Sequence, residues 1–129
     1  MFTAEPRHVT LKRKQLDNPY YLVPLGDIHF LNEACAKTKV FDTIEWIASN
    51  DCLWIGMGDM CDYIGYTDSR FDPTVIDKAM KISDLGALGK KGMDTVEEWL
   101  RPIRGKCLGL MYGNHEDAYM TYQNHARQE

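Results

Sequence analysis

The stretch YYLVPLGDIHFLN, Tyr20–Asn32, passes from an apolar segment directly into polar residues. Tyr20–Leu25 has the length and composition of a short buried strand, and Gly26 permits a tight turn after it. In an extended chain residues i and i+2 point to the same side, so we expect Asp27 and His29 to face one point beyond the strand end. An oxygen and a nitrogen ligand there suit a transition metal such as zinc, manganese or iron. Alternatively, Asp27 caps the next helix and His29 hydrogen-bonds locally.

Two further apolar segments end in the same way. Cys52–Met57 leads into GDMCD, Gly58–Asp62, and Lys106–Tyr112 leads into GNHE, Gly113–Glu116. Each glycine permits close backbone approach, so the side chain after it can be aimed into a crevice. The same pattern at three strand ends would be a coincidence if these residues were unrelated caps. We therefore expect the three strand ends to supply ligand-type side chains to one place.

Helices are expected between these strands. Apolar residues at helical spacing predict a helix near Glu33–Ser49, and weaker patterns predict helices around Val75–Ser83 and Asp94–Ile103. Alternation of helices with apolar strands is typical of right-handed crossovers and a mainly parallel sheet. Ligands bind beyond the carboxyl ends of such strands, where all three motifs lie. The sequence thus predicts an α/β fold in a single domain over residues 1–129, with Arg7–Lys14 as an edge strand.

The composition is that of an ordinary globular protein, with 129 residues, 44% hydrophobic and 26% charged. A net charge of −4 disfavours broad, charge-driven binding to nucleic acid or to an anionic membrane. The chain has no apolar run long enough for a membrane span and no signal-peptide pattern, so we expect a cytoplasmic protein without a membrane partner. Its four cysteines show no Cys-x-x-Cys pairing, which predicts reduced thiols, with Cys52 and Cys107 buried at strand starts.

The three motifs resemble those of the calcineurin-like metallophosphoesterases, which carry Asp-x-His, Gly-Asp-x-x-Asp and Gly-Asn-His-Glu, each after a strand. The sequence around them, in Leu53–Asp59, Arg70–Pro73 and Lys106–Gly109, is similar to the branch of that family found in prokaryotes and their viruses. The resemblance covers Tyr20–Glu116. It implies that the chain forms the N-terminal, strand-helix-strand half of the family's layered α/β sandwich.

Carried onto this chain, the resemblance implies four metal ligands, shared between two metal ions, and two catalytic residues. Asp27 and His29 would bind one metal, Asp59 would bridge two, and Asn114 would bind the second. His115 would protonate the leaving oxygen or steady the phosphate, so His115 and Asp59 are the expected catalytic residues. The expected cofactor is one or two divalent ions, Mn²⁺ first, with Zn²⁺, Fe²⁺ or Ni²⁺ as alternatives. Such ions activate a water and neutralise phosphate oxygens.

Four other polar residues are assigned lesser roles. Asp62 either orients a ligand or a backbone group, has a direct role in the site, or is structural. Glu116 is expected to cap or hold His115 rather than to bind metal. His8 and His125 are expected to have no part in the site, unless His125 completes the metal coordination.

The family pattern continues with another metal-binding histidine and a terminal Gly-His-x-His, and this sequence contains neither. By the family's scheme both metals lose ligands, so we expect a mononuclear or metal-poor centre unless His125 or a neighbouring chain completes it. Half of a layered domain would also expose apolar strand edges and a sheet face. The sequence therefore predicts self-association into a homo-oligomer.

The resemblance implies a hydrolase: a metal-dependent phosphatase or phosphodiesterase acting on a phosphate ester, with nucleotides and nucleic acid among the candidate substrates. The alternative is a catalytically inactive, truncated half-domain that works in binding or assembly. Tyr63–Pro73 either overhangs the crevice, with Arg70 facing phosphate, or packs on the neighbouring helix. Dinucleotide binding at Gly56-x-Gly58 is disfavoured because the third glycine of that motif is missing. A phosphate loop at Gly86–Lys91 is disfavoured because the first glycine of the phosphate-loop motif is missing.

Overall fold

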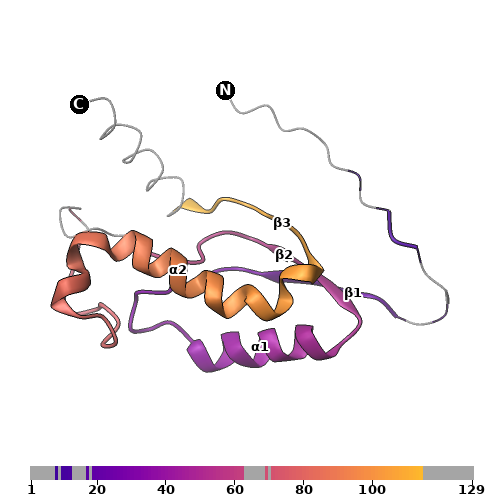
Figure 1. Ribbon diagram of the computed structural model, residues 1–129, viewed down its shortest axis with the longest axis horizontal. Coiled ribbons are helices and arrows are strands. Elements are labelled where there is room, and N and C mark those ends of the chain that lie inside the picture. Colours follow the sequence, from indigo (N-terminus) through magenta and orange to yellow (C-terminus); the bar gives the residue numbers. More distant parts are fainter. Residues whose placement is uncertain are drawn as a thin grey trace.

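The computed structural model describes residues 8, 10–12, 17, 19–62, 69 and 71–114. Its three strands, β1 (Tyr21–Leu25), β2 (Cys52–Gly56) and β3 (Cys107–Leu110), form a parallel sheet in the order β1-β2-β3. Helix α1 (Lys37–Ser49) joins β1 to β2. Helix α2 (Leu88–Leu100), flanked by the 3₁₀ helices η1 (Ile82–Ala87) and η2 (Arg101–Lys106), precedes β3 (Figure 1). The predicted α/β class and parallel sheet are confirmed.

Both α-helices pack on the same face of the sheet, because two successive crossovers move in the same direction across it. On β2 this face presents Cys52 and Trp54, each 2% exposed, and the Trp54 indole N–H donates to the carbonyl of Ile103 at 2.7 Å. Helix α1 meets them with residues spaced i, i+4 and i+7. The buried core comprises Leu25, Ile28, Phe30, Leu31, Val40, Ile44, Ile47, Cys52, Trp54, Met60, Cys61, Leu88, Val96 and Ile103.

The opposite face of the sheet is open in the described part of the chain. Leu22 on β1 is 57% exposed, and its partner in register, Leu53, is only half-buried. Ile55, two residues further along β2, is also half-buried. The sheet is therefore apolar on both faces but covered on one.

Helix α1 begins at Lys37, later than the predicted Glu33, because the residues before it are used in another way. The amide of Glu33 donates to the carbonyl of Val75 at 2.8 Å, and Asn32 forms an antiparallel bridge with Ile76. The predicted helix at Val75–Ser83 is wrong for the same reason, since its first residues make this bridge and the 3₁₀ helix η1 starts only at Ile82. None of the helices in the described residues could cross a membrane, being too short or too polar.

Helix α2 begins at Leu88, earlier than the predicted Asp94. Its first turns contain Gly89 and Gly92, which have low helix propensity but are buried here. A Cβ at Gly92 would lie 2.3 Å from the Cys61 sulfur, so glycine lets the helix pack against the segment after β2. Of the predicted edge strand at 7–14, the described residues 8 and 10–12 are not in a strand, and the rest lies outside the described residues.

The four cysteines carry free thiols, as predicted. Cys52 and Cys107 both start strands, and Cys52 is buried. Cys107 is only partly buried, contrary to prediction, because β3 forms an edge of the sheet.

Candidate metal centre

The segments that follow β1 and β2 remain hydrogen-bonded to each other beyond the strand ends. The amide of Asp27 donates to the carbonyl of Gly58 at 3.1 Å, and the amide of His29 donates to the carbonyl of Asp59 at 3.0 Å. One residue further, Phe30 forms a parallel bridge with Cys61. This continued pairing holds the first two motifs side by side at the carboxyl edge of the sheet.

Three residues of these motifs adopt the left-handed backbone conformation. The φ angles are 52° at Asp27, 49° at His29 and 50° at Asp59, and Gly58 also has a positive φ of 87°. The expected extended geometry between Asp27 and His29 is therefore wrong, although their side chains do converge. Asp and His are among the residues that tolerate this conformation best, yet each instance costs about 1–3 kcal/mol and tends to occur at functional sites.

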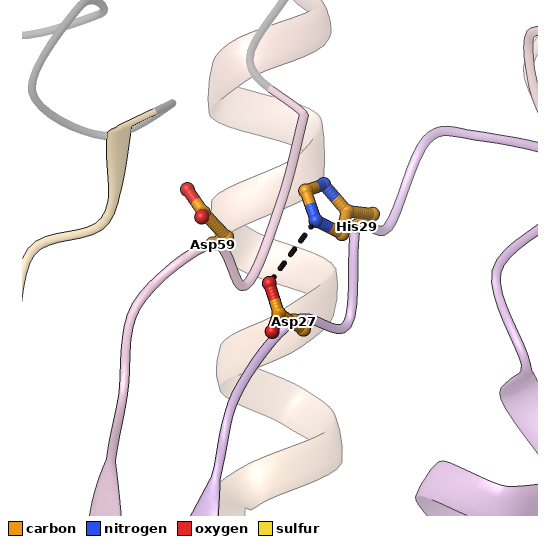
Figure 2. Close-up of side chains that lie close together, drawn as sticks. All are labelled: Asp27, His29 and Asp59. Carbon is orange, nitrogen blue, oxygen red and sulfur yellow. Dashed lines mark ion pairs between the residues drawn. The ribbon is translucent and has the colours of Figure 1, made fainter.

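The side chains of Asp27, His29 and Asp59 form one cluster, in which one ligand atom from each lies within 4.8 Å of the others. Figure 2 shows the three side chains lying close together on the two adjacent segments, with Asp27 and His29 facing each other. The His29 Nε2 atom is 3.4 Å from Asp27 Oδ1. The Asp27 side chain is 86% exposed and the His29 side chain 36%. The predicted convergence of these three residues is confirmed, and the cluster opens to solvent.

Asp62 lies behind the cluster and contacts His29 from the other side of the ring. Its Oδ1 is 2.8 Å from His29 Nδ1, and its side chain is only 12% exposed. Burial by itself lowers the pKa of His29, but the hydrogen bond and charge of Asp62, with the nearby Asp59 and Asp27, outweigh it and raise the pKa above its usual value. Of the roles the sequence left open for Asp62, the contact with His29 supports the orienting one.

The third motif reaches the same place through its glycine. A Cβ built on Gly113 would lie 2.3 Å from both the amide nitrogen and Oδ1 of Asp59, and one on Gly58 would lie 2.3 Å from the nitrogen of Gly113. Only glycine, which has no side chain, allows the segment after β3 to approach the segment after β2 this closely. Asn114, which follows Gly113, is exposed.

The remaining predicted site residues, His115, Glu116 and His125, lie outside the described residues, as does most of the segment Tyr63–Arg70. His8 is exposed. The structure therefore tests the first two motifs and the glycine of the third.

The donor set of the cluster suits a divalent cation. Two carboxylates and an imidazole converge, a third carboxylate holds the imidazole, and the exposed position of Asp27 leaves room for water or substrate as further ligands. The negative charge gathered here favours a cation. The sequence offered Asp62 as an orienting residue but could not identify His29 as its partner, since residues that far apart in the chain carry no spacing signal.

No protein family, curated protein or solved structure matches this chain in the comparisons made. The residues of the site therefore carry the functional assignment.

Proposed function

We propose that this chain is a metal-dependent phosphoesterase that hydrolyses a phosphomonoester or phosphodiester. The observation that carries the proposal is the convergence of Asp27, His29 and Asp59 in left-handed backbone conformations at the ends of adjacent parallel strands. A strained backbone conformation persists only where the surrounding contacts stabilise it. Here the strained residues are the three whose ligand-type side chains lie close together. The motif resemblance supports assigning the sheet and its helices to half of a calcineurin-like metallophosphoesterase domain.

In this proposal each residue has a distinct task. Asp27, His29 and Asp59 hold the metal. The motif resemblance assigns Asn114, which follows Gly113, to a second ion beside Asp59. A bound Mn²⁺ or similar ion would polarise the phosphate and lower the pKa of a bound water.

Two further residues complete the proposed site. Asp62 keeps the His29 ring in orientation through Nδ1, which leaves Nε2 toward the cluster. His115 is assigned by sequence to protonating the leaving oxygen or steadying the phosphate.

The first experiment compares metal-free protein with protein resupplied with Mn²⁺ in hydrolysis of bis(p-nitrophenyl) phosphate and p-nitrophenyl phosphate. Asp59→Asn removes a ligand charge and is expected to lower Mn²⁺-dependent turnover by about 100-fold or more. Asp51→Asn is the matched control, because Asp51 is exposed and precedes β2 at the end opposite to Asp59. It is expected to retain wild-type turnover.

Metal binding is measured on the same samples by titration calorimetry. Binding that is lost in Asp59→Asn, together with no turnover for Mn²⁺, Zn²⁺, Fe²⁺ or Ni²⁺, would contradict catalysis and favour the inactive half-domain. Binding that is equal in Asp59→Asn and wild type would show that the cluster is not the metal site.

A further inference from the structure

The two edge strands of the sheet, β1 and β3, differ in whether a further strand could pair with them. Along β1, the carbonyl of Leu25 and the amide of Asp27 form hydrogen bonds on the β2 side. Because the backbone groups of successive residues in a strand point to opposite sides, those of Pro24 lie on the outer edge. Proline has no N–H to donate, and prolines on edge strands discourage further strand pairing. The β1 edge is therefore blocked.

The β3 edge has no such protection among the described residues. The amide of Met111 donates to the carbonyl of Gly56 at 2.8 Å, so the backbone of the preceding Leu110 is directed outward. No described element pairs with this outer side, and Figure 1 shows β3 bordering the sheet. An edge of this kind presents backbone groups ready to pair with another strand.

The side chains at the carboxyl end of this edge are apolar and exposed, whereas those of Cys107 and Leu108 are partly buried. Cys107–Tyr112, CLGLMY, contains no charged residue. Leu110 is 66% exposed, Met111 52% and Tyr112 72%. Exposed edges in monomers commonly carry lysine or are covered by another element, and neither protection is found here in the described structure. The protection that is present is the short length of β3, four residues, and an irregular register opposite Trp54–Gly56.

We propose that the β3 edges of two copies of this chain pair antiparallel about a twofold axis, joining two three-stranded sheets into one. A twofold contact places identical surfaces against each other, so it is favoured where the surface carries no charge that would meet its own copy. Each chain has a net charge of −4, and the uncharged strip Cys107–Tyr112 lets two such chains approach without placing like charges opposite each other. A second copy is therefore the occupant that the edge suits.

The antiparallel arrangement separates association from metal binding. The carboxyl ends of the two β3 strands, and with them the two Asp27–His29–Asp59 clusters, come to lie at opposite ends of the joined sheet. Neither cluster is covered by the pairing. This inference accordingly does not rest on the proposed function.

Sedimentation velocity tests the inference over about 1–500 µM, a range suited to the weak affinity expected of a short contact. Wild type is expected to shift from the chain mass of 14.9 kDa toward twice that mass. Leu110→Lys places like charges near each other across the pair and is expected to raise the dissociation constant about tenfold or more. Leu22→Lys, at an exposed leucine of the blocked edge strand, is the matched control and is expected to dimerise as wild type.

Hydrogen exchange of the segment 107–112 supplies a second readout that needs no variant. Its amides are expected to exchange more slowly at concentrations where the dimer forms. A wild type that stays monomeric throughout overturns the inference. So does a dimer without this protection, or one that Leu110→Lys leaves intact or that Leu22→Lys weakens equally.

Discussion

At the carboxyl end of β2, the buried carboxylate of Asp62 holds the Nδ1 atom of His29 at 2.8 Å, while Nε2 lies toward Asp27. When Nδ1 is the donor in the neutral ring, Nε2 keeps the lone pair that a metal requires. The contact therefore selects both the orientation and the tautomer of the His29 ring.

The first prediction concerns this contact. Asp62→Ala is expected to weaken Mn²⁺ binding by about 10–100-fold, because the imidazole loses the partner that orients it. Asp62→Asn retains an oxygen acceptor for Nδ1–H and is expected to recover much of the affinity. Calorimetry measures the affinity, and ¹⁵N chemical shifts of the His29 ring measure the tautomer. Equal affinity in Asp62→Ala and wild type would contradict an orienting role.

The second prediction concerns the close approach of Gly113 to Asp59. A Cβ there would lie 2.3 Å from backbone and side-chain atoms of Asp59, and backbone cannot give way cheaply. Gly113→Ala is expected to destabilise the fold by about 1–3 kcal/mol in urea unfolding and to weaken metal binding.

Gly105→Ala is the control for that substitution, because an added Cβ at Gly105 meets nothing within 4 Å. It is expected to leave metal binding unchanged. If Gly113→Ala behaves in the same way, the third motif does not contact the site as described.

Among the elements, helix α1 is fixed at both ends by lysines. At its carboxyl end Lys106 Nζ donates to the carbonyls of Ile47, Ala48 and Asn50 at 2.6–3.1 Å. At its start Lys37 forms an ion pair with Asp77, whose side chain is only 5% exposed and also accepts from the amide of Ala79. The Lys106 contacts satisfy carbonyls that the last turn leaves unpaired and place a cation where the helix dipole favours one. The N-terminus has no side-chain cap, and the Lys37–Asp77 pair ties it to the segment before η1.

The third prediction follows from the pKa of Asp77. Burial alone would raise this pKa, but the hydrogen bonds from Lys37 and Ala79 and the charge of Lys37 lower it below its ordinary value of 3.8. The folded-state pKa lies below the unfolded one, so the charged carboxylate stabilises the fold above the unfolded pKa, and this contribution is lost as pH falls through the folded pKa.

Asp77→Asn is therefore expected to cost about 1–3 kcal/mol of unfolding free energy at neutral pH, with the difference from wild type shrinking below pH 3.8. Urea unfolding at several pH values measures this. Asp94→Asn breaks the exposed Lys90–Asp94 pair and is expected to change little. A difference for Asp77→Asn that is independent of pH would contradict the ion-pair explanation.

At the scale of the whole molecule, the site joins two segments that only the fold brings together. The proposed metal ligands come from the segments after β1 and β2, so a metal that binds the folded site should stabilise the folded chain. The fourth prediction is that Mn²⁺ at about 100 times its dissociation constant adds about 2.7 kcal/mol and raises the Tm by about 10 °C. Asp51→Asn is expected to keep this shift and Asp59→Asn to lose it. Equal shifts in both variants would place the metal elsewhere.

The strands and their order could be predicted because apolar segments of strand length, separated by helical patterns, leave few arrangements that bury them. The boundaries of the helices could not be predicted from the sequence. Helix α1 starts late because Glu33 and Asn32 pair with Val75 and Ile76, and such pairing across distant segments leaves no local signal. Helix α2 starts early because packing against Cys61 outweighs the low helix propensity of Gly92.

By itself, the sequence determined the α/β alternation, the glycine at each strand end and the identity of Asp27, His29 and Asp59 as ligand-type residues, because these depend on residue type and local spacing. Only the tertiary structure decided how they meet. The left-handed backbone at all three residues, the hold of Asp62 on His29 and the contact of Gly113 with Asp59 arise from hydrogen bonds and packing between segments distant in the chain. The place of β3 at an edge of the sheet, among the residues that the structure describes, likewise follows from sheet order, which local sequence does not encode.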